Sequence, residues 1–70
     1  MKTIYNVTEQ HTNKVHTFKS ISKAKQFIEN WGTENDQNLG KVDINRRTIL
    51  WNVGTFKEPI LQFSRHTIFN

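Results

Sequence analysis

The sequence contains no cysteine among its 70 residues, so it has no disulfide framework, no thiolate nucleophile and no cysteine-based zinc site. A chain without cysteine suits a reducing compartment, and we expect a cytoplasmic protein. No apolar run exceeds the three residues 49–51, which is far too short to span a bilayer. Residues 1–7 also lack the apolar stretch of a signal peptide, so we expect no membrane association.

Glycine is scarce, and the three glycines lie too far apart to form a loop that cradles a phosphate. The three histidines lack the helical i, i+4 spacing of metal-binding pairs, and the six acidic residues suggest no acid–base pair. An enclosed substrate pocket of about 300 Å³ or more is also difficult to build in so small a chain. We therefore expect a protein that is not an enzyme, with no catalytic residue, no metal site and no cofactor.

What the chain does have is enough apolar side chain for one small core. Leu, Ile, Val and Phe together exceed the level of about 20% below which chains stay disordered. A folded chain of this size exposes about 4,600 Å² and has no room for a second core. We expect a single domain over residues 1–70.

The first part of the chain predicts a β-hairpin, because residues 2–9 and 14–19 are rich in β-branched and aromatic side chains and residues 10–13 are polar. Pairing Glu9 with Lys14 sets the register. Val7 then faces His16, and Tyr5 faces Phe18 on the same side of the sheet. These three pairs define the register of the first predicted hairpin.

The next segment predicts a helix, with Ser20 as its N-cap and Gly32 as the residue just after its end. The apolar residues switch there to helical spacing and form one core-facing stripe. They are Ile21, Ala24, Phe27, Ile28 and Trp31. Residues 32–40 have turn-forming composition and no periodicity, so we expect a loop.

Residues 41–53 predict a second hairpin that turns at residues 45–48 and pairs Ile44 with Ile49. This register places Leu50 on the opposite face from the apolar residues of the hairpin. The residues that share the apolar face are Val42, Ile44, Ile49, Trp51 and Val53. Residues 60–64, after Pro59, predict a last strand.

The resulting order, β-β-α-β-β-β, predicts a small α+β domain with a mostly antiparallel sheet and one helix packed across one face. A single helix leaves the second sheet face uncovered, so that face meets either solvent or a partner. Leu50, Phe56 and Phe69 are the apolar residues that we expect to find exposed. An uncovered face also favours self-association as a homo-oligomer.

The chain has a net charge of +4, and its lysines cluster around the predicted helix start. Between residues 10 and 28 there is no acidic residue, and the lysines are Lys14, Lys19, Lys23 and Lys25. Positive charge at a helix N-terminus opposes the helix dipole, so helix stability does not explain this placement. We hypothesise that the first-turn N–H groups, with Lys19, Ser20, Ser22 and Lys23, bind an anion. The alternative is that these lysines only keep the protein soluble.

A second basic feature is the pair Arg46 and Arg47 at the tip of the predicted second hairpin. Projecting guanidinium groups suit phosphates, a DNA minor groove or an acidic protein patch. The alternative is a solvated turn. No zinc finger, helix-turn-helix or ribonucleoprotein motif is present, and the tryptophans are assigned to the core.

These observations favour a non-catalytic basic protein that inhibits or regulates a macromolecular partner by stoichiometric binding. The partner would be an acidic protein surface or a nucleic-acid-binding protein. The small size and the excess of Asn, Lys, Ile and Thr fit an inhibitor made by a phage or mobile element against a host system. The alternative is a module that binds DNA or RNA directly through phosphate contacts. The residues that would carry either function are Lys14, Lys19, Ser20, Ser22, Lys23, Lys25, Arg46, Arg47 and Arg65.

Overall fold

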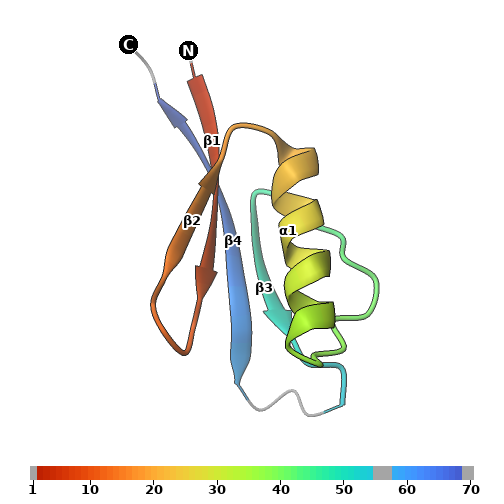
Figure 1. Ribbon diagram of the computed structural model, residues 1–70. Coiled ribbons are helices and arrows are strands. Elements are labelled where there is room, and N and C mark those ends of the chain that lie inside the picture. The colour runs from red at the N-terminus through yellow and green to blue at the C-terminus, as the bar shows by residue number, and fades with distance from the viewer. Residues whose placement is uncertain (1, 55–57, 69–70) are drawn as a thin grey trace.

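The computed structural model describes residues 2–54 and 58–68 of the chain. These residues form strands β1 (Lys2–Glu9), β2 (Val15–Phe18), β3 (Arg47–Trp51) and β4 (Pro59–Ile68), and helix α1 (Ile21–Glu34). The strands form one antiparallel sheet in the order β2-β1-β4-β3, with α1 against one face (Figure 1). The predicted α+β class is therefore confirmed, with the order β-β-α-β-β in the described part of the chain.

The first hairpin forms in the predicted register. Tyr5 pairs with Phe18 and Val7 with His16, and the Glu9 backbone N–H donates to the Lys14 carbonyl oxygen at 2.9 Å. Val7 is fully buried on the side of the sheet that α1 covers. The alternation of apolar and polar residues was sufficient here because the two strands are joined by a short turn.

Helix α1 begins at Ile21 after Ser20, as predicted, but it continues to Glu34 rather than ending before Gly32. Gly32 is buried inside the helix. A Cβ atom at this position would lie 3.1 Å from the carbonyl oxygen of Gln37. Gly32 is thus needed for the close approach of the following loop, whereas the left-handed turn falls at Asp36, with φ of 52°. On the predicted apolar stripe, Ile21 is exposed and is not part of the core.

The predicted second hairpin is wrong, because residues 41–45 form no strand and β3 pairs with β4 instead. One helix about 10 Å wide cannot cover a four-stranded sheet about 19 Å across. The segment between α1 and β3 covers the remaining area and runs beside α1 (Figure 1). It buries Val42 and Ile44 in the core without strand pairing.

The predicted faces of β3 are inverted. Leu50 lies opposite the fully buried Leu61 and is itself only 6% exposed, whereas Ile49 lies opposite Gln62 and is 44% exposed. The expected exposure of Leu50 is therefore wrong, and Phe56 and Phe69 lie outside the described residues. The error follows from the wrong partner strand, since a strand's buried face is set by the strand beside it.

Strand β4 is longer than predicted and occupies a central place, paired with β1 on one side and β3 on the other. Its alternating residues Leu61 and Phe63 lie at the centre of the core. The buried residues are Val7, Ala24, Ile28, Val42, Ile44, Leu50, Ile60, Leu61 and Phe63. Within the described ranges no polar or charged residue is buried, so the charged groups lie at the surface.

Candidate binding surface

The sheet face opposite α1, which we call the open face, is covered by no helix in the described part of the chain (Figure 1). Residues paired across antiparallel strands point to the same face, so the registers identify its side chains. From β2 to β3, one row is Val15, Thr8, Gln62 and Ile49, and the next is Thr17, Asn6, Ser64 and Arg47. Two shorter rows follow, Ile4 with His66 and Lys2 with Ile68.

Side-chain hydrogen bonds within and between strands order the polar centre of the open face. The Thr17 hydroxyl donates to Asn6 Oδ1 at 2.8 Å, and Ser64 Oγ lies 3.1 Å from His66 Nε2. With its amide oxygen turned toward β3, Gln62 accepts hydrogen bonds from Nε and Nη2 of Arg47 at 3.1 Å each. The side chain of Arg47 is therefore held over the sheet.

Three arginines line a groove of about 440 Å³ at the end of the sheet where β3 begins. Arg47 pairs with Ser64 on the open face, whereas Arg65 pairs with Tyr5 and starts from the helix side. The Arg65 backbone N–H donates to the Arg46 carbonyl oxygen at 2.9 Å, which places these two arginines side by side. The groove, which we call the arginine groove, is lined by Arg46, Arg47, Gln62, Ser64, Arg65 and His66. No acidic residue lines it, and the one ion pair in the described residues, between His16 and Glu9, lies elsewhere.

Exposed aliphatic side chains lie beside this groove and across the rest of the open face. Ile49 adjoins Arg47 on β3, Val15 lies on the β2 edge, and Ile68 lies near the end of β4. All three are at least 40% exposed. The four rows contain no Phe, Tyr or Trp, but Trp51 follows Arg47 and Ile49 in the alternation of β3 and is half-buried opposite Pro59, after a register shift. The surface thus combines arginine and aliphatic side chains with one tryptophan at its border.

Of the predicted site residues, the structure brings Arg46, Arg47 and Arg65 together. Arg46 and Arg47 do not form a hairpin tip, because Arg46 precedes β3 and Arg47 is its first residue. Sequence reasoning missed Gln62, Ser64 and His66 as their neighbours. Gln62, Ser64 and His66 alternate along β4 with Leu61 and Phe63, which indicates a shared solvent-facing side. The sequence could have shown this for His66 only if the predicted strand had extended beyond residue 64.

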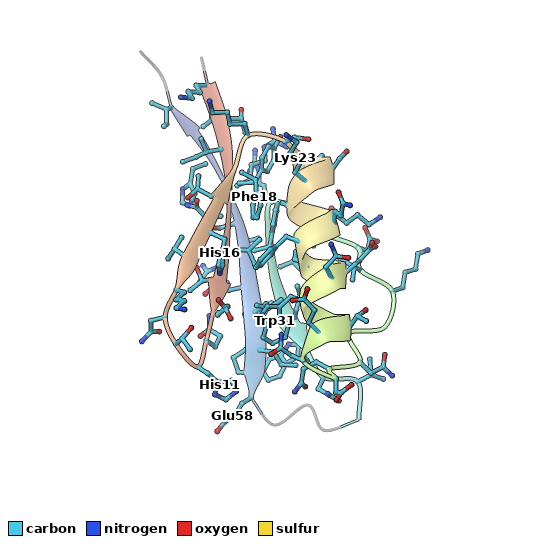
Figure 2. The ribbon with its side chains drawn as sticks, in the orientation of Figure 1. His11, His16, Phe18, Lys23, Trp31 and Glu58 are labelled. Carbon is cyan, nitrogen blue, oxygen red and sulfur yellow. The ribbon has the colours of Figure 1, made fainter. Side chains whose placement is uncertain are left out.

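None of the predicted helix-start residues, all of which lie in the described part of the chain, lines the arginine groove. Lys19, Ser22 and Lys23 are exposed, and Ser20 is the N-cap but makes no side-chain capping hydrogen bond. Figure 2 shows Lys23 on α1, which packs on the other side of the sheet from the open face. The remaining predicted residues are Lys14, in the loop before β2, and Lys25, exposed on α1. The anion site at the helix start thus stays a prediction.

A second polar cluster lies between α1 and the first hairpin. His16 Nε2 is 2.6 Å from Glu9 Oε2, and the Trp31 indole N–H donates to Glu9 Oε1 at 2.9 Å. Two hydrogen bonds hold the pKa of Glu9 below its ordinary value of 4.5. The bond from His16 has the larger effect, and the bond from Trp31 has the next largest. His16 also packs on Phe27, with ring centroids 4.4 Å apart. Figure 2 shows His16 and Trp31 between the sheet and α1, so this cluster joins three elements of the fold.

The described residues contain no group of three or more His, Cys, Asp or Glu side chains that could hold a metal ion. Helix α1 is not long and apolar enough to cross a membrane, and no other helix occurs in residues 2–54 and 58–68. Comparison of the chain with protein-family models, curated proteins and solved structures finds no match. The argument about function therefore depends on the surface itself.

Proposed function

We propose that the protein is a non-catalytic binding domain that docks its open face on an acidic surface of a partner protein and regulates that partner by occupying it. The observation that carries the proposal is the arginine groove, which has no acidic lining residue and adjoins exposed aliphatic side chains. Arginines without an internal counter-charge can pair with carboxylates or phosphates of another molecule.

The composition of the open face favours a protein partner. Protein interfaces combine apolar contact with arginine and are depleted in lysine, and the open face has Arg47 beside Ile49 on β3. A standard interface needs about 800 Å² from each partner. The total accessible surface is 5163 Å², so one such interface would use a modest part of it.

Direct binding of DNA or RNA is the second candidate, and the arginine groove is also what supports it. Proteins that bind single strands usually stack successive bases on several aromatic rings, whereas the four rows of the open face contain none and have Trp51 at their border. Lys23 and Lys25 belong to α1, which packs on the sheet face opposite the open face (Figure 1). On the open face itself, Arg47 and Lys2 lie two rows apart on different strands, so the described rows form no continuous basic track for a phosphate backbone.

Within this proposal the protein acts stoichiometrically in the cytoplasm, as a small inhibitor made by a phage or mobile element would. Its size and its lack of cysteine agree with that setting.

The proposal is tested by affinity capture from a host extract with two matched variants, Ile49→Glu and Ile21→Glu. Ile49 and Ile21 are 44% and 41% exposed, but Ile49 lies on the open face and Ile21 on α1. We expect the protein captured by the wild type to be retained by Ile21→Glu and lost with Ile49→Glu, because an acid at position 49 would repel an acidic partner. Circular dichroism checks that both variants are folded.

Three outcomes would contradict the proposal: equal retention by both variants, loss with Ile21→Glu alone, or loss of capture after nuclease treatment. A salt series with labelled single-stranded and double-stranded oligonucleotides, read by fluorescence anisotropy, covers the second candidate. Binding whose log affinity falls steeply with log salt would favour nucleic acid. We expect no such binding at physiological salt.

A further inference from the structure

We propose that the arginine groove binds a phosphoryl group on a side chain of the partner protein. This inference rests on the proposed function for its choice of a protein partner. It adds the chemical group that the groove recognises and the residues that would hold it.

The charge of the groove exceeds what a single carboxylate needs. Arg46, Arg47 and Arg65 line one groove of about 440 Å³, and each guanidinium carries a permanent positive charge. A partner's aspartate or glutamate would bring one negative charge, whereas a phosphorylated side chain brings about −1.5 to −2. The phosphoryl group is the better match to three arginines in a groove whose described lining residues include no acid.

The hydrogen-bond donors of the groove also fit a phosphoryl group. Each guanidinium presents several N–H donors in a planar fork, and a phosphoryl group offers three acceptor oxygens. Ser64 and His66 line the same groove and lie 3.1 Å apart, so a hydroxyl and an imidazole are available beside the arginines. Clusters of arginine are the recurring means by which proteins recognise phosphorylated segments.

The place of the groove favours a short phosphorylated segment over a long nucleic acid. The arginines gather at one end of β3, and the neighbouring row of the open face is Val15, Thr8, Gln62 and Ile49. A nucleic acid extending along that row would meet no Lys or Arg in it, and in the other direction the next such residue of the described rows is Lys2, two rows away. A peptide segment with one phosphoryl group could instead place apolar side chains on Ile49.

The test is a titration followed in ¹⁵N–¹H NMR spectra at constant ionic strength. The probes are inorganic phosphate and three five-residue peptides that differ only in a central phosphoserine, glutamate or serine. We expect saturable shifts of the backbone amides that line the arginine groove, and at least ten-fold tighter binding of the phosphoserine peptide than of the glutamate peptide. A five-nucleotide single-stranded DNA is the fourth probe, and we expect it to bind more weakly than the phosphoserine peptide.

Two double variants remove the same charge from different places. Arg46→Ala/Arg65→Ala should weaken binding of the phosphoserine peptide at least ten-fold. Lys23→Ala/Lys25→Ala should change the affinity for this peptide less than two-fold. Arg46→Lys/Arg65→Lys keeps the charge but loses the planar fork, so we expect an intermediate loss. All four side chains are exposed, and the spectra themselves report whether each variant is folded.

Three results would each overturn the inference. They are equal affinity for the phosphoserine and glutamate peptides, an equal loss of phosphoserine-peptide binding in Lys23→Ala/Lys25→Ala and Arg46→Ala/Arg65→Ala, and chemical shifts that do not saturate. If the phosphoserine peptide does not bind but Ile49→Glu still abolishes capture of the partner protein, the inference is wrong and the proposed function is not. If the phosphoserine peptide binds but Ile49→Glu leaves capture unchanged, the proposed function is wrong and the phosphoryl site stands. Tighter binding of the oligonucleotide than of the phosphoserine peptide would contradict both.

Discussion

Adjacent residues of β4 belong to two different surfaces. Leu61 and Phe63 point toward α1 and are fully buried, whereas Gln62 and Ser64 point to the open face and reach solvent. The helix side holds the buried core, with Val7 and Ile28 packed around these two residues. The open face has instead the arginine groove and exposed aliphatic side chains.

This difference shows how a 70-residue chain can fold and still present a recognition surface. So small a domain buries only about 60% of its unfolded surface, and here the buried residues gather on the helix side. Polar and charged residues of the open face bury less apolar surface, so we expect them to contribute less to stability than the core does. We therefore expect substitutions on the two faces to affect different properties.

The largest expected change in stability separates two neighbouring residues of β3, one buried and one exposed. Leu50→Ala should lower the free energy of unfolding by about 2–4 kcal/mol, because it removes a buried side chain next to Leu61. Ile49→Ala should cost about 0.5 kcal/mol, because Ile49 is largely exposed. Urea denaturation measures both. A larger loss for Ile49→Ala would mean that the register of β3 is inverted.

A smaller effect is expected in the segment that completes the cover of the helix side. Val42→Ala should cost about 1–2 kcal/mol, since Val42 is buried although it lies outside any strand. The neighbouring Asp43 is exposed, and Asp43→Ala should change stability by less than about 0.5 kcal/mol. Thermal unfolding of the two variants compares them. Equal stabilities would show that this segment does not contribute to the core.

The smallest of these effects depends on pH. The pKa of Glu9 is lowered in the folded protein by its hydrogen bonds from His16 and Trp31. The ionised carboxylate therefore stabilises the fold above its ordinary pKa of 4.5, and this contribution is lost as the pH falls through the lowered value. Glu9→Gln should cost about 1 kcal/mol at pH 7.

The difference between wild type and Glu9→Gln should shrink as urea unfolding is repeated from pH 6 to pH 3. Glu29→Gln serves as the control, because Glu29 is exposed on α1. A difference that stays constant over this range would mean that the carboxylate charge of Glu9 does not stabilise the fold.

The fold could be predicted from the sequence where pairing is local. A turn of a few residues joins β1 to β2, so alternation alone gave Tyr5 opposite Phe18. Strand β3 has apolar residues at three consecutive positions, Ile49, Leu50 and Trp51, so its pattern allowed either face to be buried. Pairing with β4 decided between them, and that choice depends on the whole core rather than on neighbouring residues.

The candidate site was predicted only in part, for a related reason. Arg46, Arg47 and Arg65 were identified by charge alone, but their convergence follows from the backbone hydrogen bond between Arg65 on β4 and Arg46, the residue before β3. Gln62, Ser64 and His66 join them through the alternation of β4. The predicted strand ended at residue 64, so the prediction left out His66, the next residue on this side of β4. The lysines of the helix start were equally prominent in the sequence, yet none of these described residues lines the groove.

The most direct test of the account is to add the captured partner to ¹⁵N-labelled protein and map the amides whose signals change. The account predicts changes on the open face and at the arginine groove, including Thr17, Ile49, Arg47 and Ser64. It predicts unchanged signals on the exposed side of α1, at Lys25, Glu29 and Asn30. Changes centred on α1 with an unaffected open face would contradict it.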